Sequence, residues 1–117
     1  MAYDTNNVFA RMLRKEIPCQ VVFEDDRCLA FRDIAPQAPT HVLVVPKTPI
    51  AKLADASLAQ RELLGHLLWA CGEVARLLGI ADDGFRVVVN NGTGAQQTVF
   101  HLHLHLLAGR PLTWPPG

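Results

Sequence analysis

The sequence predicts an α+β fold with one antiparallel sheet of about five strands, one long helix and one short helix. Short β-prone runs follow one another through loops of a few residues, which antiparallel neighbours can use and parallel neighbours cannot. A single long stretch carries apolar residues at helical spacing. Because one long helix leaves much of such a sheet uncovered, we expect the chain to form a homodimer.

The first half of the chain supplies a short helix and three strands. The helix is expected to begin after Asn6 or Asn7, either of which can cap it, and to end before Pro18. Two strands then form a hairpin whose loop is Asp25-Asp26-Arg27, and a third follows a proline-punctuated loop. The three predicted strands are Val21–Glu24, Cys28–Arg32 and His41–Pro46.

The second half supplies the long helix and two more strands. Ser57 and Gln60 form a capping box at the start of the helix, and Gly79 ends it. Gly65 inside it costs on the order of 1 kcal/mol relative to Ala, which indicates a close approach of another backbone. The last two strands are predicted at Phe85–Asn90 and Val99–Leu107.

Composition indicates one domain over residues 1–117. The chain is 50% hydrophobic and 19% charged, so it can bury a core. Eleven Lys and Arg balance 11 Asp and Glu without a basic block, which argues against nucleic acid as a partner. The three cysteines form no Cys-x-x-Cys pair and the start lacks a signal-peptide pattern, so we expect a cytoplasmic protein. No apolar run reaches the roughly 18 to 20 residues of a membrane span.

Three alternating histidines carry the chemistry. In a strand, His101, His103 and His105 share one face while leucines occupy the other. Zinc is one interpretation, but the outer two would lie about 13 Å apart along a strand. A zinc site would therefore need two of the three together with His41 or His66. We expect catalysis without a metal or other cofactor.

Nucleophilic catalysis is the other interpretation of the row. A neutral imidazole can attack phosphorus and form a covalent intermediate, while its neighbours bind the anion or move protons. The preceding loop, Asn90 to Thr98, offers backbone N–H groups, the Gln97 amide and the Thr98 hydroxyl beside the row. Such donors suit a phosphoryl oxygen.

The His-x-His-x-His run followed by two apolar residues resembles the signature of the histidine triad family. Nearly the whole chain resembles its nucleotide-binding, Hint-like branch. The segments that carry the resemblance are Arg14-Lys15-Glu16-Ile17-Pro18, Phe23 to Phe31, Asp33-Ile34, Pro36 to His41, Leu63 to Leu67, Gln97-Thr98-Val99, Gly109-Arg110 and Trp114-Pro115-Pro116-Gly117.

The resemblance implies a purine nucleoside phosphoramidate hydrolase whose sheet extends across a homodimer. It implies cleavage of P–N bonds, with AMP or GMP derivatives as substrates, and of aminoacyl adenylates. His103 is then the nucleophile, flanked by His101 and His105 and supported by His41. Residues 109–117 are then a C-terminal segment near the partner's site.

The resemblance also implies which residues bind the nucleotide. Asp33 and Ile34 match positions at the ribose and base, while Asn90, Gln96, Gln97 and Thr98 match the phosphate loop, with His103 and His105 at the phosphate. Gln96 departs from the glycine that this loop commonly carries, which strains the backbone if it needs a positive φ. Two rival functions stay open: a diadenosine polyphosphate hydrolase or nucleotidyl transferase, and a nucleotide-binding scaffold.

Overall fold

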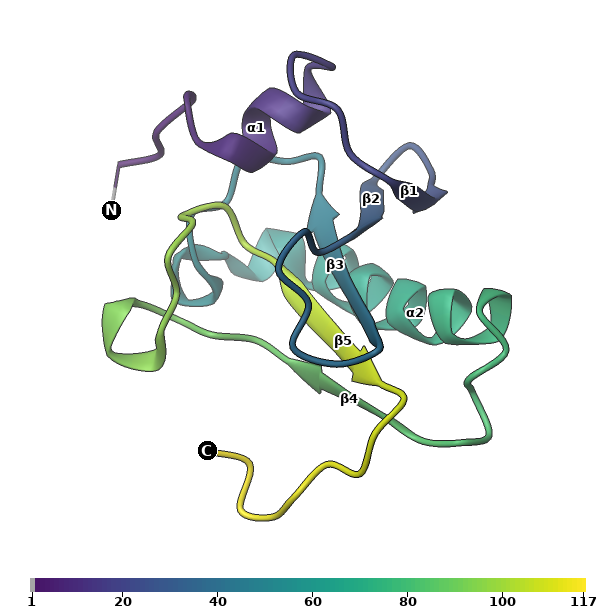
Figure 1. Cartoon of the computed structure of the whole chain (residues 1–117). Coiled ribbons are helices and arrows are strands. Elements are labelled where there is room, and N and C mark those ends of the chain that lie inside the picture. Colours follow the sequence, from purple (N-terminus) through teal and green to yellow (C-terminus); the bar gives the residue numbers. More distant parts are fainter. Residues whose placement is uncertain (1) are drawn as a thin grey trace.

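Five antiparallel strands form one sheet in the computed structural model, which describes residues 2–117 (Figure 1). Met1, where the predicted domain begins, lies outside the described residues. The helices and strands are α1 (Val8–Leu13), β1 (Val21–Glu24), β2 (Cys28–Arg32), β3 (Thr40–Pro46), α2 (Arg61–Leu77), β4 (Phe85–Val88) and β5 (Leu104–Ala108). The strand order is β1-β2-β3-β5-β4, with every neighbouring pair antiparallel. The predicted fold class is confirmed.

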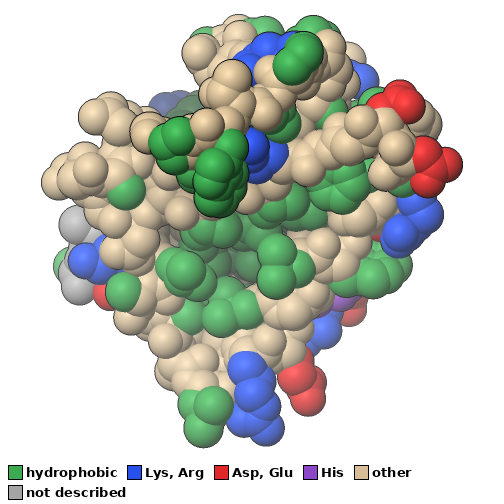
Figure 2. Space-filling model, turned by 90° about the horizontal axis from the view of Figure 1, so that it is seen from below, with side chains coloured by type: hydrophobic (Ala, Val, Ile, Leu, Met, Phe, Trp, Pro, Cys, Tyr) green, Lys and Arg blue, Asp and Glu red, His purple; other side chains and the backbone are tan. Residues whose placement is uncertain are grey.

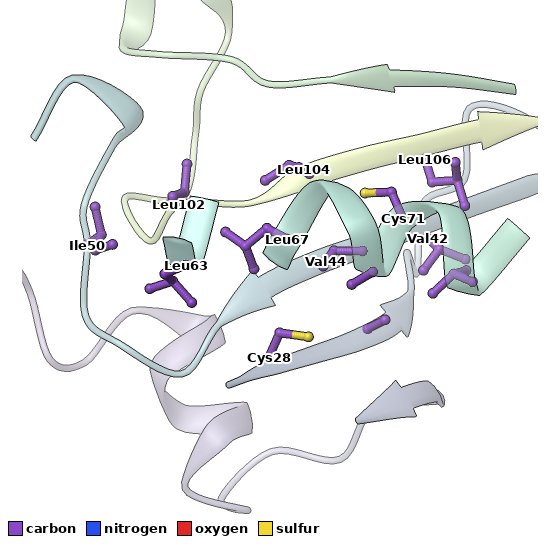
Figure 3. Close-up of a cluster of buried hydrophobic side chains, with 13 residues drawn as sticks. Cys28, Val42, Val44, Ile50, Leu63, Leu67, Cys71, Leu102, Leu104 and Leu106 are labelled. Atoms are coloured by element: carbon purple, nitrogen blue, oxygen red, sulfur yellow. The ribbon is translucent and has the colours of Figure 1, made fainter. Parts of the chain in front are cut away.

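The alternation of side chains along the strands gives the sheet two apolar faces. One face packs against α2 (Figure 3), and its strand residues are Cys28, Ala30, Val42, Val44, Leu104 and Leu106. The intervening residues face α1, where they contact Phe9 and Met12; they are Leu29, Phe31, Leu43 and Val45. The central strand β3 is therefore buried on both faces. Because α1 is short, it covers only part of its face and leaves room for a pocket.

The helix ends follow the predicted signals with one shift. The Asn7 side chain accepts a hydrogen bond from the Ala10 N–H and caps α1. The capping box of Ser57 and Gln60 is present, but it begins a single 3-10 turn, Leu58–Gln60, and α2 starts after it. Gly79 follows α2 at φ 72°, the left-handed conformation that ends helices. None of the described helices is long and apolar enough to cross a membrane.

Gly65 does not mark a close backbone approach within the chain. A Cβ built there meets no atom within 4 Å among the described residues, and the position is exposed. The prediction from its helix propensity is therefore wrong for the single chain. The glycine lies on the solvent side of α2, opposite the buried Leu63 and Leu67.

The last strand is shorter than predicted, because it begins at Leu104 rather than Val99. Its partner β4 ends at Val88, opposite His105, so the residues before Leu104 have no strand beside them on that side. They bond instead to the segment after β3: the Gln97 amide to the Ala51 carbonyl, and the Leu102 N–H to the Ile50 carbonyl. The three histidines therefore do not lie in one regular strand, and only His105 belongs to β5.

Candidate active site

A pocket of about 250 Å³ lies on the α1 face of the sheet. Most of its wall is apolar, and these residues come from α1, β2, β3 and the loops beside them: Val8, Phe9, Met12, Phe31, Ile34, Leu43 and Val99. Its polar residues come from the end of β2 and the loop after it, from the segment that leads into β5, and from β5 itself: Arg32, Asp33, Thr98, His103 and His105. The fold thus brings together five residues of the predicted site that are far apart in the sequence: Asp33, Ile34, Thr98, His103 and His105.

His103 is held in one orientation by the backbone. Its Nδ1 lies 2.7 Å from the carbonyl oxygen of His101, and Phe9 meets its ring edge-on with the centroids 5.0 Å apart. A carbonyl oxygen can only accept, so Nδ1 carries the proton and Nε2 keeps a lone pair. The carbonyl that orients the ring is therefore that of His101. A neutral imidazole in this form has one nitrogen left to act as a nucleophile.

His105 takes the opposite tautomer. The Gln37 N–H donates to Nδ1 of His41 at 3.0 Å, so the His41 proton lies on Nε2. That Nε2 lies 2.9 Å from Nδ1 of His105 and donates to it. The remaining nitrogen of His105, Nε2, therefore carries a hydrogen. The pocket thus contains one imidazole with a free lone pair and a neighbour with a free N–H, their ring centroids 5.0 Å apart.

The side chain of His101 lies in the core beside the site. It is fully buried and does not line the pocket. Its Nε2 lies 2.8 Å from the carbonyl oxygen of Pro46, and its Nδ1 lies 2.6 Å from the hydroxyl of Tyr3. The chain thus holds His101 at both ring nitrogens.

Burial keeps these imidazoles neutral. It lowers the pKa of His101 and His103 below the usual histidine range, and it lowers that of His41 although Asp33 acts in the opposite direction. Burial, together with the neighbouring His103 and His41, lowers the pKa of His105 to about 4. All four side chains are therefore uncharged at neutral pH, which a nucleophilic imidazole requires.

The loop before β5 is held by Gln97. Its amide donates to the carbonyl oxygens of Ala51 and Val99, and its Oε1 accepts from the Gly92 N–H. Both amide hydrogens are therefore used within the chain, where this side chain holds the loop. Gln96 adopts φ 68°, so the position does require the left-handed conformation that glycine favours.

Five of the predicted site residues do not line the pocket, and the sequence argument missed several residues that do. The five are His41, Asn90, Gln96, Gln97 and His101. The α1 side chains Val8, Phe9 and Met12 form part of its wall, but their helical spacing looks the same for a core face and for a pocket wall. Tyr3 was also missed, because no sequence pattern connects it to a histidine 98 residues away.

Two groups in the described chain combine donor types that bind metals. Asp33, His41 and His105 form one, and their ligand atoms lie within 4.8 Å of one another. The second, Asp25, Cys28 and His66, lies away from the pocket, between the β1–β2 hairpin and α2. In both groups a hydrogen bond links two members: His41 to His105, and His66 to Asp25 at 2.7 Å.

An antiparallel sheet with three alternating histidines at the edge of an apolar pocket defines the histidine triad class of proteins. The chain belongs to the HIT domain family, which matches residues 14–112. It is 56% identical over 117 residues to a HIT-like protein of Synechocystis sp., covering 100% of both chains. It is 48% identical over 116 residues to a 14 kDa zinc-binding protein of Zea mays, covering 97% of this chain and 90% of that protein.

Solved structures agree with the family. The crystal structure of a HIT family hydrolase from Legionella pneumophila has a TM-score of 0.93 to this chain and is 48% identical to it. The match covers 96% of this chain and 100% of that one. The likeness therefore extends over nearly the whole fold.

Proposed function

We propose that this protein hydrolyses purine nucleoside phosphoramidates through a covalent nucleotidyl-histidine at His103. The observation that carries the proposal is the hydrogen bond from His103 Nδ1 to the His101 carbonyl, which leaves the other ring nitrogen free as a nucleophile in the pocket. The similarity to a HIT family hydrolase supports hydrolysis as the reaction class.

The chemistry runs in two displacements at phosphorus. His103 Nε2 attacks, a P–N bond forms to the imidazole, and the P–N bond to the substrate's amine breaks as the amine takes up a proton from solvent. The Nε2–H of His105 donates to a phosphoryl oxygen and stabilises the charge that develops there. Water then attacks phosphorus, the bond to His103 breaks, and a nucleoside monophosphate and free enzyme result. The His101 carbonyl stabilises the imidazolium character of the intermediate.

The pocket walls suit a nucleoside. A carboxylate at Asp33 can accept hydrogen bonds from both hydroxyls of a ribose. Its Oδ1 already accepts from the Ala35 N–H, which fixes the carboxylate. The apolar wall around Phe9 and Phe31, with Ile34 at the rim, offers a surface for a purine ring. For Thr98 we propose donation to the phosphate or to the leaving amine, and for Asn90 and Gln96 a contribution to the phosphate loop.

His103→Ala tests the mechanism. Turnover of adenosine phosphoramidate should be lost while AMP binding survives, because the nucleophile is removed but the ribose and base contacts remain. Intact mass and peptide mapping of a quenched wild-type reaction should find the nucleotidyl group on His103. The matched control is His66→Ala, which removes a histidine outside the pocket. An adduct on another residue, or full activity of His103→Ala, would contradict the mechanism.

We also propose that the active form is a homodimer. β4 is an edge strand of the sheet, and Phe85 on it and Leu68 on α2 are exposed large apolar side chains. Figure 2 views the side on which β4 and the C-terminus lie in Figure 1, and hydrophobic side chains gather in the middle of that face. Sedimentation should give twice the chain mass, and Leu68→Glu should lower it. A monomeric wild type at micromolar concentration contradicts the proposal.

A cytoplasmic location is part of the same proposal. All three cysteines are free thiols, and two of them, Cys28 and Cys71, are buried. Burial raises their pKa values, to about 12 for Cys28 and about 11 for Cys71, so they remain unreactive thiols. Activity should therefore be the same with and without a reducing agent. Recovery of the native protein in a periplasmic or secreted fraction would contradict the location.

Zinc binding is the second candidate function. It is supported by the ligand atoms of Asp33, His41 and His105, which lie within 4.8 Å of one another, and by the zinc-binding name of the maize relative. Imidazole and carboxylate donors suit zinc, and bound zinc would polarise a phosphoryl oxygen. Turnover after dialysis against a chelator distinguishes the two candidates: our mechanism requires an unchanged rate, and recovery only with zinc would favour the metal.

A further inference from the structure

We propose that Tyr3 is a positioning residue that holds the His101–His103 segment in its reactive arrangement. This inference rests on the proposed function. Tyr3 is the only tyrosine of the chain and lies before residues 14–112, the part that matches the family. The N-terminal arm, residues 2–7, runs beside the segment that precedes β5 (Figure 1), and there the Tyr3 hydroxyl meets Nδ1 of His101 at 2.6 Å.

The direction of this hydrogen bond follows from the partner of the other ring nitrogen of His101, Nε2. His101 Nε2 lies 2.8 Å from the Pro46 carbonyl oxygen, which can only accept, so the proton of the neutral ring is on Nε2. Nδ1 then has a lone pair, and the Tyr3 hydroxyl must donate to it. Because His101 is fully buried, no solvent replaces this donor when it is removed.

The bond matters for the site because the surrounding backbone has little other support. Residues 98–103 belong to no strand. In the described chain their backbone is held by two hydrogen bonds: the Leu102 N–H donates to the Ile50 carbonyl at 2.7 Å, and the Gln97 side chain donates to the Val99 carbonyl. The His101 side chain supplies a third anchor of the same segment, through Pro46 and Tyr3. The carbonyl of that same residue orients His103. Loosening the His101 ring therefore loosens the group that fixes the nucleophile.

Tyr3→Phe removes the donor and keeps the ring, which packs edge-on against His101 with centroids 5.7 Å apart. We expect kcat for adenosine phosphoramidate to fall at least tenfold, a barrier increase of about 1.4 kcal/mol, because small displacements of a nucleophile slow its attack strongly. KM and the Kd for AMP should stay within twofold, since Tyr3 does not line the pocket. The matched control is Asp4→Asn in the same arm, whose carboxylate bonds only to the Asn6 N–H in the described chain.

Nitrogen-15 NMR of the histidine rings gives a readout that does not depend on turnover. The wild type should show His103 with its proton on Nδ1 alone, and Tyr3→Phe should show exchange between the two tautomers. Circular dichroism confirms that both variants are folded before either spectrum is taken.

Each outcome decides the proposal. A kcat of Tyr3→Phe within twofold of wild type overturns it. An equal loss of kcat in Asp4→Asn also overturns it, because any disturbance of the N-terminal arm would then be enough to slow turnover. A fall in kcat with an unchanged His103 spectrum also overturns it, because Tyr3 would then act elsewhere. If the wild type turns over no phosphoramidate, the proposed function fails, and the His103 spectrum of Tyr3→Phe still decides whether Tyr3 holds this segment.

Discussion

At the scale of the residue, identical side chains acquire different roles from their hydrogen-bond partners. His103 donates from Nδ1 to a carbonyl and keeps a lone pair on Nε2, whereas His105 accepts at Nδ1 and keeps a hydrogen on Nε2. His101 has both nitrogens occupied in the core. In the proposed mechanism the three positions therefore divide into a nucleophile, a donor and a structural support.

The acid side of the pH profile tests this arrangement. Burial lowers the pKa of His103 and brings that of His105 to about 4, so both stay neutral below the ordinary histidine value of about 6.5. The logarithm of kcat/KM should therefore stay level as the pH falls through 6.5 and decline only at lower pH. Initial rates from pH 4 to 8 measure it. A midpoint at or above 6.5 would show that the imidazoles are solvated.

The strained residue of the phosphate loop gives a second prediction at this scale. Gln96 has φ 68° and an exposed side chain. Gln96→Gly should raise the free energy of unfolding by on the order of 1 kcal/mol, because glycine adopts this conformation without a Cβ clash. It should change kcat/KM by less than about tenfold. Urea unfolding and steady-state rates measure both, and a larger loss of rate would assign Gln96 a direct substrate contact.

At the scale of the element, one carboxylate ties the β1–β2 hairpin to α2. Asp25 Oδ1 accepts from the Arg27 and Cys28 N–H groups and closes the turn, while Oδ2 accepts from Nε2 of His66 on α2. Partial burial alone raises the pKa of Asp25, but these hydrogen bonds outweigh it and lower the pKa to about 2. The ionised form is therefore the one that stabilises the hairpin.

This shift predicts how stability depends on pH. A carboxyl whose pKa is lowered by folding contributes stability that is complete above its unfolded pKa, about 3.9, and is lost as the pH falls through the folded value. The difference in unfolding free energy between wild type and Asp25→Asn should therefore shrink from pH 5 to pH 2. Urea titrations at each pH measure the difference. The control is Asp26→Asn, whose side chain is exposed in the same turn, and a pH-independent difference for Asp25→Asn contradicts the assignment.

At the scale of the whole molecule, the C-terminal segment runs beside the edge strand β4 without joining the sheet (Figure 1). The Arg110 side chain donates to the Gln37 carbonyl, in the loop whose N–H fixes His41. Beyond it, Trp114 is 81% exposed, and the Arg86 guanidinium of β4 lies 6.0 Å from its ring centroid. A large exposed aromatic beside the edge strand supports the proposal that residues 109–117 lie near the partner's site in a dimer.

Truncation tests this segment. Deletion of residues 112–117 should leave the dimer and the turnover of the simplest phosphoramidate intact, because the catalytic residues all precede it. The ranking of kcat/KM among substrates with larger amines should change, since the tail would border the leaving group. A series of amines of increasing size, measured on full-length and truncated protein, provides the comparison, with Trp114→Ala as the point variant. A uniform change across the series would show that the tail does not select the leaving group.

The sequence by itself determined the fold class, most strand positions and two histidines that line the pocket, His103 and His105. Alternating and helical periodicities are local signals. They identify strands and helices in a sequence because each face of such an element lies in a single environment. The hairpin at Asp25 and the end of the long helix at Gly79 follow from turn chemistry alone. The resemblance raised a positive φ at Gln96 only as a condition, and the folded chain shows that the condition holds, with φ 68°.

Only the tertiary structure decided which groups meet. The strand β5 begins five residues later than its alternation predicts, because its neighbour β4 ends at Val88 and the preceding segment bonds to residues 46–51 instead. In the same region the Gln97 side chain bonds to the Ala51 carbonyl and the Tyr3 hydroxyl bonds to His101. Hydrogen bonds between residues dozens of positions apart leave no periodic trace in a sequence, so the tautomers on which the proposed chemistry depends became readable only from the folded chain.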